Sequence, residues 1–211
     1  PLEDCQSGYL KLNHYDTIME KIEWADSVVI GPGIGRNIET QSLIKKLVLN
    51  IKKPLVVDAD GLSCFEGNAR DLFQRKFPLV ITPHFGELSR LLNISINKLI
   101  IKFPQIMENF MRQFSHTALV KQVPACTFSD KFAFLNTTGN PGLATAGSGD
   151  VLAGMLGSFI SQGFNLSIST RMAAFIHGKS SDLLIDEKGY RGQLASDLLN
   201  LIPSVISNYE N

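Results

Sequence analysis

The stretch PLVVDA, residues 54–59, decides the fold. Its continuous apolar run is rich in β-branched residues and is bounded by proline and aspartate, which is typical of a strand buried on both faces. Three other runs share this character: DSVVIG (26–31), PLVIT (78–82) and TALVKQV (117–123). Strands of this kind belong to parallel sheets that are covered by helices, so the sequence predicts an α/β protein.

Helical patterns lie between these strands. IETQSLIKKLVLNI (38–51) is one, and PQIMENFMRQF (104–114) repeats apolar residues at helical spacing behind Pro104, which we expect at the first helical position. Parallel neighbours need long crossovers, and helices usually supply them. The alternation therefore predicts a mostly parallel central sheet with helices on both faces, in three α/β/α layers.

The last third of the chain differs from the rest. Three helices are predicted, at GDVLAGMLGSFISQG (149–163), LSISTRMAAFIHGKSSDLLID (166–186) and ASDLLNLIPSVIS (195–207), the first of them apolar nearly all round and therefore buried. KFAFLN (131–136) alternates and is expected to pair with the strand at 117–123 as a hairpin across ACTFSD (125–130). Without a repeat or a linker, residues 1–211 are expected to form a single domain.

Composition narrows the class of partner. Lys+Arg and Asp+Glu balance at 20 each, and no basic run carries interleaved aromatics, so neither a nucleic acid nor an anionic membrane is expected to bind. No apolar run reaches the ~18 residues of a membrane span. Cys5, Cys64 and Cys126 are scattered and odd in number, which favours reduced thiols in a cytoplasmic protein. The chain opens on Pro1, so we expect a fragment of a longer product.

Chemistry-bearing residues follow each predicted strand, where ligands of open α/β sheets bind. They are the glycines of GPGIG (Gly31, Gly33, Gly35), then Asp58 and Asp60, then His84 and Glu87 of TPHFGE, and finally Lys121. Each also has a structural interpretation: turn glycines, a tight turn or helix cap at DADG, a turn or core histidine, and a solvated lysine. His14, His116 and His177 are assigned to such structural roles.

The segment GNPGLATAGSGD, residues 139–150, is more specific. Gly147 and Gly149 let backbone N–H groups converge at the start of the buried helix, so Gly147, Ser148 and Gly149 are expected to form an anion hole. Asp150 is the one charged residue from Phe132 through Thr170. In the functional interpretation it takes a proton from a substrate hydroxyl while the N–H groups hold a transferring phosphoryl group. In the structural one, Asp150 or Ser148 caps the helix.

Taken together, the motifs resemble the ADP/ATP-dependent NAD(P)H-hydrate dehydratase family, which has a ribokinase-like fold, over residues 25 to 206. They are VVIGPGIG (28–35), VVDADGL (56–62), ITPHFGELSRLL (81–92), GNPGLATAGSGDVLAGM (139–155) and RGQLASDLLNLIP (191–203). The resemblance implies a repair reaction with Mg²⁺: ADP or ATP phosphorylates the hydroxyl of hydrated NADH or NADPH, and phosphate then leaves. It also implies a homo-oligomer, and an epimerase that is fused to this domain or works with it.

The resemblance assigns roles residue by residue. It makes Asp150 the catalytic acid/base, in contact with substrate, and sets Gly149 beside the nucleotide. His84 would lie near the hydrated nicotinamide, with Gly33 or Gly35 as the glycine of close approach. Glu87, three residues after His84, is similar to the glutamate of the Asn-x-x-Glu pattern that organises Mg²⁺ in related vitamin kinases. The residues implied to border the adenine nucleotide are Lys121, Gln122, Val123, Pro124 and Ala125.

Some features depart from the family pattern. KQVPACT (121–127) has Gln122 after the lysine where the family has a small residue, and Pro124 removes a backbone donor. Phe85 stands in the usual proline position, and an N-terminal strand and helix of the family are absent.

Two alternatives remain open. One is a vitamin-precursor kinase of the same fold. His84, which stands where those kinases tend to have asparagine, and the GNPG segment favour the dehydratase over this kinase. The other alternative is a nucleotide-binding protein without catalysis. A hydride-transferring dehydrogenase lacks support, since no GxGxxG motif is present.

Overall fold

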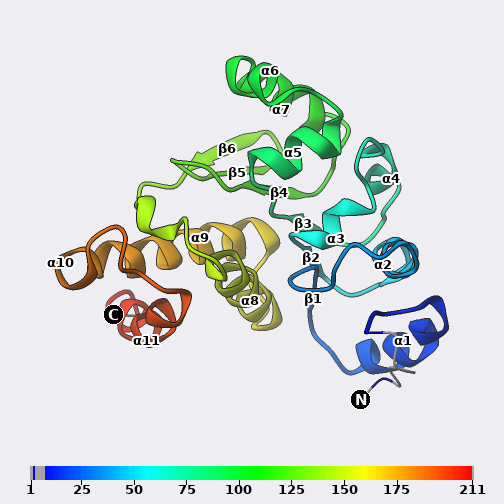
Figure 1. Cartoon of the computed structure of the whole chain (residues 1–211), viewed down its shortest axis with the longest axis horizontal. Helices are drawn as coiled ribbons and strands as arrows, with labels where there is room; N and C mark the ends of the chain where they lie inside the picture. The colour runs from blue at the N-terminus through cyan, green and yellow to red at the C-terminus, as the bar shows by residue number, and fades with distance from the viewer. Residues whose placement is uncertain (1, 3–7, 211) are drawn as a thin grey trace.

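A single mixed sheet organises the chain. The structure is a computed structural model that describes residue 2 and residues 8–210. Its six strands lie in sequence order, the first four parallel and the last two antiparallel (Figure 1). They are β1 (Val28–Ile30), β2 (Leu55–Val57), β3 (Leu79–Ile81), β4 (Thr117–Val120), β5 (Cys126–Ser129) and β6 (Phe132–Leu135). The mostly parallel sheet and the five strand segments that the sequence predicts are confirmed.

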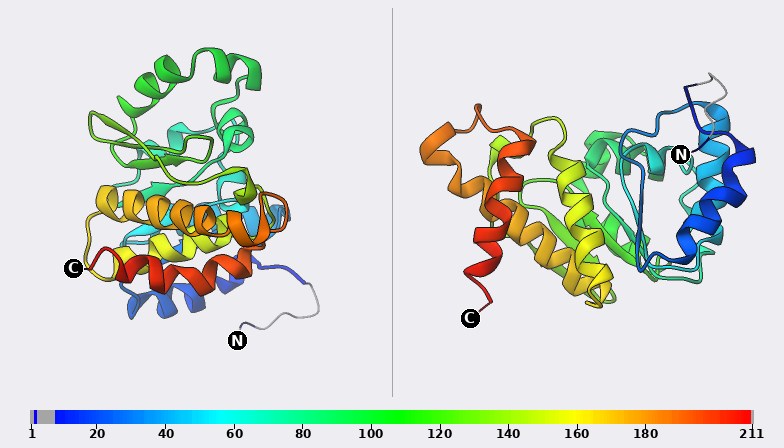
Figure 2. Two further views of the ribbon diagram at one scale, coloured as in Figure 1. Left: turned by 90° about the vertical axis from the view of Figure 1, so that its left-hand side faces the viewer. Right: turned by 90° about the horizontal axis from the view of Figure 1, so that it is seen from below.

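Helices cover both faces of this sheet. Each parallel strand lies next to the one that precedes it in the sequence, always on the same side. Right-handed crossovers between these strands therefore place the connecting helices on one face of the sheet. That face carries α1 (Tyr15–Glu23), α2 (Ile38–Asn50), α3 (Asp60–Ser63), α4 (Arg70–Phe73), α5 (Phe85–Leu92), α6 (Ile96–Ile101) and α7 (Phe103–Met111). The opposite face carries α8 (Ser148–Ser161), α9 (Leu166–Leu183) and α11 (Ala195–Ser207), which run alongside one another (Figure 2). The short elements are η1 (Leu12–His14), η2 (Pro141–Leu143) and α10 (Ile185–Lys188).

The strands divide their side chains between two apolar cores. Leu55 and Val57 of β2 point into the core shared with α2, α5 and α7, while Val56 points into the core shared with α8 and α9. All three side chains are fully buried. This explains why the strand segments are apolar throughout instead of alternating, and it confirms the three-layer α/β/α architecture.

Two details of the sequence prediction are wrong. The segment 125–130, expected as a turn, contains β5, which pairs with both β4 and β6. Thr127 and Ser129 of this strand are buried although they are polar, so hydrophobicity gave no strand signal there. Pro104 lies at the second helical position instead of the first, since α7 already begins at Phe103.

The structure describes two of the three cysteines. Cys64 and Cys126 are free thiols, and burial raises their pKa values to about 12 and about 11. They are packing residues rather than reactive ones. Cys5 lies outside the described residues. Among the helices that the structure describes, none is both long and apolar enough to cross a bilayer.

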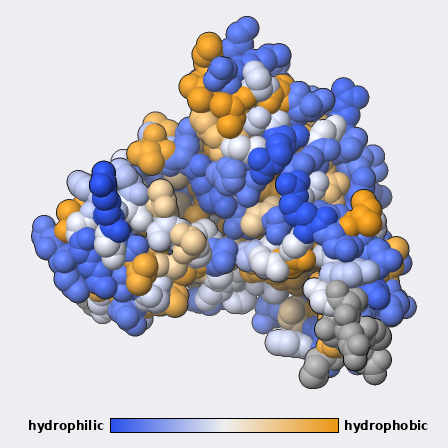
Figure 3. Space-filling view, in the orientation of Figure 1, coloured by the Kyte–Doolittle hydropathy of each residue, from blue (hydrophilic) through white to orange (hydrophobic). Residues whose placement is uncertain are grey.

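An apolar surface is exposed at one end of the molecule. Ile96, Ile100 and Ile101 of α6 keep 45%, 57% and 77% of their surface in solvent. Figure 3 shows hydrophobic surface at the top of the molecule, where Figure 1 places α6. This patch lies away from the edge of the sheet that carries the motifs.

Candidate functional site

The loops after β1 and β2 are interlocked. Gly31 has a φ of +136°, and a Cβ added there would lie 1.7 Å from the carbonyl oxygen of Asp58. The N–H of Gly35 donates to Asp60 Oδ2 at 3.1 Å. Gly33 and Gly35 also have positive φ, yet no atom lies within 4 Å of a Cβ added at either. Gly31 is therefore required for packing, whereas Gly33 and Gly35 leave an open surface.

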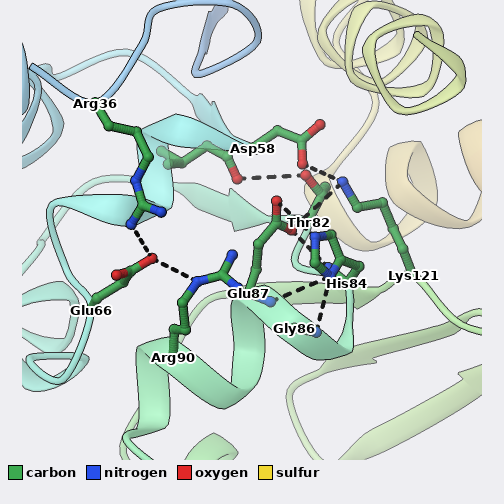
Figure 4. Close-up of polar contacts among 10 residues, drawn as sticks. Arg36, Asp58, Glu66, Thr82, His84, Gly86, Glu87, Arg90 and Lys121 are labelled. Atoms are coloured by element: carbon green, nitrogen blue, oxygen red, sulfur yellow. Dashed lines mark hydrogen bonds and ion pairs between the residues drawn. The ribbon is translucent and has the colours of Figure 1, made fainter. Parts of the chain in front are cut away.

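Lys121 forms the centre of the candidate site (Figure 4). Its Nζ lies 2.5 Å from Asp58 Oδ1 and 3.9 Å from Glu87 Oε2. The Asp58 side chain is only 2% exposed and that of Lys121 is 21% exposed. The interpretation of Lys121 as a solvated lysine is wrong, because the lysine neutralises a buried carboxylate. The same contact shows that Asp58 does more than turn the chain.

His84 and Glu87 form a reciprocal cap at the start of α5. His84 Nδ1 accepts from the N–H groups of Gly86 at 2.9 Å and Glu87 at 3.3 Å. In return Glu87 Oε2 accepts from the N–H of His84 at 2.8 Å. Since Nδ1 accepts, a neutral ring carries its proton on Nε2, which lies 3.4 Å from Glu87 Oε1. The structural interpretation of His84 as a turn residue is thus confirmed, and half of its ring remains exposed to a ligand.

The N-terminus of α8 opens next to Lys121. Gly147 is the N-cap with a φ of +83° and has no side chain with which to cap. A Cβ added at Gly149, in the first turn, would lie 3.5 Å from Lys121 Nζ and 3.8 Å from Asp58 Oδ2. The N–H of Ser148 donates to the carbonyl oxygen of Thr145 at 3.3 Å. The first turn at Gly149 and the lysine ammonium nevertheless face the same space, which favours an anion.

Two predictions about this helix start need correction. Ser148 does not cap the helix, because its hydroxyl lies 3.3 Å from Nε2 of the buried His177. Asp150 is exposed, so its apolar sequence neighbours do not enclose it. The neighbours are apolar because they face the core below α8, while the first turn of the helix projects Asp150 outward.

His177 supports the first turn of α8 from within the core. Its Nε2 lies 3.0 Å from the carbonyl oxygen of Ser148, which can only accept, so Nε2 is the donor. Burial lowers the pKa of His177 to about 4 and keeps the ring neutral. Its assignment to a structural role is confirmed, but its place beneath the predicted anion hole had no signal in the sequence.

The GNPG and RGQLASD motifs meet in a polar network behind this turn. Asp182 accepts from the N–H of Gly139 and from Asn140 Nδ2, both at 3.0 Å. Gln193 Nε2 donates to Asn140 Oδ1 at 3.4 Å. Asn140 and Gln193 are buried, so these residues fix the loop that leads to α8.

The segment that continues from Lys121 is open to solvent. Val123 is 79% exposed and Pro124 is also exposed, before the chain enters β5 at Cys126. The N–H of Lys121 donates to the carbonyl oxygen of Pro83 at 2.8 Å, which extends the β3–β4 pairing up to the site. At the beginning of this segment, Lys121 lies beside the first turn of α8.

One carboxylate of the site fits a nucleotide-bound magnesium ion. In the described part of the chain, no three His, Cys, Asp or Glu side chains are grouped as a metal cage. Asp58 is buried and already paired with Lys121, whereas Glu87 lies 3.9 Å from the lysine and its side chain is 11% exposed. Because Mg²⁺ at phosphate sites takes only one or two carboxylates and completes its shell with water and phosphate oxygens, Glu87 suffices.

Fold and site together define a class of protein. The structure is similar to that of a ribokinase-like superfamily protein from Enterococcus faecalis: the TM-score is 0.79, at 26% identity over 95% of this chain and 69% of that one. The chain is thus ribokinase-like. More narrowly, it belongs to the NAD(P)H-hydrate dehydratase family, whose model matches residues 5–204.

Similar proteins support this membership. The bifunctional NAD(P)H-hydrate repair enzyme of Moorella thermoacetica is 35% identical over 99% of this chain and 40% of its own length. The corresponding enzyme of Escherichia coli is 32% identical over 91% and 36%. The ADP/ATP-dependent NAD(P)H-hydrate dehydratase of Bacillus subtilis, co-crystallised with ATP and Mg²⁺, gives a TM-score of 0.78 at 27% identity, over 91% of this chain and 70% of that one. The chain therefore spans about 40% of the curated relatives it matches.

Proposed function

We propose that this chain regenerates NADH or NADPH from the hydrated cofactor by phosphorylating its hydroxyl with ADP or ATP and expelling phosphate. The observation that carries the proposal is the convergence of Lys121, Asp58 and the glycine-rich start of α8 at one edge of the sheet. Family membership supports the choice of substrate.

The phosphoryl group occupies the start of α8. Backbone N–H groups of Gly147, Ser148 and Gly149 hold its oxygens, with the N–H of Ser148 exchanging its 3.3 Å bond to the carbonyl oxygen of Thr145 for the phosphoryl group. The segment from Lys121 to Ala125, with Gly149, borders the adenine nucleotide. Pro124 offers no N–H there, so contacts from Gln122 and Val123 carry the backbone recognition. The positive end of the helix and the lysine stabilise the charge of the transferring group.

The hydrated nicotinamide lies on the other side of Asp150. Gly33 and Gly35 leave room for close approach of the ring, and His84 contributes its Nε2–H from above α5. Asp150, exposed in the first turn of α8, is free to accept the proton of the substrate hydroxyl. The resulting oxygen attacks the terminal phosphorus, and the bond from that phosphorus to the remaining nucleotide breaks.

Departure of phosphate completes the reaction. The carbon–oxygen bond breaks with both electrons going to phosphate, and the neighbouring carbon loses a proton to form the ring double bond. Glu87 is the residue that would hold Mg²⁺ with the nucleotide phosphates. When bound, the ion neutralises the charge on those oxygens.

Other parts of the proposal concern the whole protein. We expect residues 1–211 to act as one ribokinase-like domain, in a cytoplasmic protein. Homo-oligomerisation is also expected, and the exposed Ile96, Ile100 and Ile101 offer apolar area for it. The relatives are named bifunctional repair enzymes, which supports an epimerase as a fused or separate partner.

The test is recovery of the NADH absorbance band. The protein is incubated with hydrated NADH, Mg²⁺ and either ADP or ATP. Recovery that requires the nucleotide and is lost in Asp150→Asn supports the proposal and identifies the phosphoryl donor. A binding protein would show no turnover in either form.

A further inference from the structure

A second cationic group lies beside the proposed substrate surface (Figure 4). Arg36 Nη2 lies 2.5 Å and Arg90 Nε 2.8 Å from the same oxygen, Oε1 of Glu66. Arg36 directly follows the GPGIG loop, and Arg90 projects from α5, the helix that His84 caps. Two guanidinium groups thus share one carboxylate, which leaves an excess of one positive charge.

The other acids of this region are engaged elsewhere. Asp60 accepts the N–H of Gly35, and Asp58 and Glu87 lie against Lys121. Across the described residues, Glu66 is the one carboxylate within ion-pair distance of either arginine. Each guanidinium donates through a single nitrogen to Glu66, so further donors remain for a ligand.

The arginine pair is continuous with the proposed nicotinamide surface. A Cβ added at Gly86 would lie 2.7 Å from His84 Cε1 and 3.5 Å from Arg90 Nη1. The imidazole and the guanidinium therefore border the same small space above the start of α5. A ligand that contacts His84 with one end extends over Arg90 with the next part of its structure.

The ion pairs of Arg36 and Arg90 with Glu66 contribute little to the stability of the fold. The side chains of Arg36 and Arg90 are 52% and 45% exposed, and exposed ion pairs contribute at most about 1 kcal/mol. Paired guanidinium groups with unused donors instead match the geometry of phosphate oxygens.

We infer that Arg36 and Arg90 bind a phosphate group of the dinucleotide substrate while its nicotinamide contacts His84, an inference that rests on the proposed function. This phosphate belongs either to the pyrophosphate bridge, which hydrated NADH and hydrated NADPH share, or to the 2′-phosphate that only the latter carries. Arg36 and Arg90 thereby contribute to substrate recognition on the side of the site opposite the adenine nucleotide.

Titration calorimetry with hydrated NADH and hydrated NADPH, without ADP or ATP, tests the inference. Arg36→Gln and Arg90→Gln are each expected to weaken binding about tenfold or more, as loss of a hydrogen bond between charged groups requires. Arg112→Gln is the matched control, because Arg112 forms an exposed ion pair with Glu108 on α7. Arg36→Lys keeps the charge and reports whether the planar guanidinium matters.

Each outcome is informative. If the variants bind both ligands equally more weakly, the arginines contact the pyrophosphate bridge. If only the affinity for hydrated NADPH falls, they contact the 2′-phosphate. Unchanged affinity for both ligands in folded Arg36→Gln and Arg90→Gln overturns the inference. If the wild-type chain regenerates NADH but these variants bind normally, only the inference fails; if it binds through the arginines without turnover, only the proposed function fails.

Discussion

Lys121 neutralises Asp58 at the carboxyl edge of the sheet, with Nζ 2.5 Å from Oδ1 and the carboxylate almost completely buried. The two residues directly follow β4 and β2, which are not neighbours in the sheet, so this contact spans the end of β3. The pair is a structural link between the two strand ends, and its ammonium is the group that faces the proposed phosphate site.

Removing one partner of this pair is costly. Lys121→Met leaves a buried carboxylate without a counter-ion and is expected to lower the free energy of unfolding by about 3–5 kcal/mol. The double variant Lys121→Met/Asp58→Asn removes the charge as well and is expected to recover most of that loss. Urea denaturation of the two variants and the wild type measures both effects. A single variant within about 1 kcal/mol of wild type would show that the pair is solvated, like an exposed ion pair.

Asp150 is expected to matter for activity and not for folding. Asp150→Asn removes the proposed proton acceptor and is expected to lower kcat by about 10²–10⁴-fold. Because the side chain is exposed, its free energy of unfolding changes by no more than about 1 kcal/mol, the contribution of an acid near a helix start. Asp16→Asn, at an exposed acid in the first turn of α1, is the control for charge. Full activity in Asp150→Asn would remove this residue from the chemistry.

Glycines of the GPGIG loop are expected to respond differently to the same substitution. Gly31→Ala places a methyl group 1.7 Å from the carbonyl oxygen of Asp58 and is expected to prevent stable folding. Gly33→Ala meets no neighbouring atom, so only its positive φ carries a cost, about 1–2 kcal/mol. Thermal unfolding of both variants measures the contrast. Similar stability of the two would contradict the interlocked loops.

Stability is expected to fall in mild acid because of His177. Its pKa is about 4 in the folded chain and about 6.5 when unfolded, so between these values the unfolded state binds more protons. The free energy of unfolding therefore falls as pH drops from 6.5 towards 4, by up to about 3 kcal/mol from this residue. Burial also lowers the pKa of His116, which acts in the same direction. Denaturation at pH 7 and pH 5 is expected to show a smaller difference in His177→Gln; an unchanged difference would contradict this assignment.

The sequence predicts the sheet well because its strands are short, apolar and sharply bounded. All five predicted strand segments contain a strand, and the helix predicted at 195–207 has the observed bounds. Strand β5 is not predicted, because hydrophobic patterning along the chain cannot identify a strand whose polar residues are buried. Thr127 and Ser129 are buried because β5 lies between β4 and β6, which no local pattern reveals.

Some residues of the candidate site could also be predicted from the sequence, and others could not. Those at strand ends were found because topology alone brings Asp58, His84 and Lys121 to one edge. The ion pair between Lys121 and Asp58 depends on a side-chain contact across the sheet, which the sequence does not reveal. From the sequence alone, a solvated Lys121 is therefore as plausible as a paired one. The polar network of Asp182, Asn140 and Gln193 joins segments far apart in sequence, and composition gives no indication of it. The roles of Asp150, Gly33, Gly35 and Glu87 in binding and catalysis stay predictions.

One measurement addresses the central claim directly: simultaneous quantification of NADH and inorganic phosphate produced from hydrated NADH with Mg²⁺ and ADP or ATP. The account predicts one phosphate released for each NADH regenerated, both dependent on the nucleotide and on Asp150. Consumption of the nucleotide with the phosphate retained on a stable product, and no recovery of NADH absorbance, would contradict it and identify the protein as a kinase of the same fold.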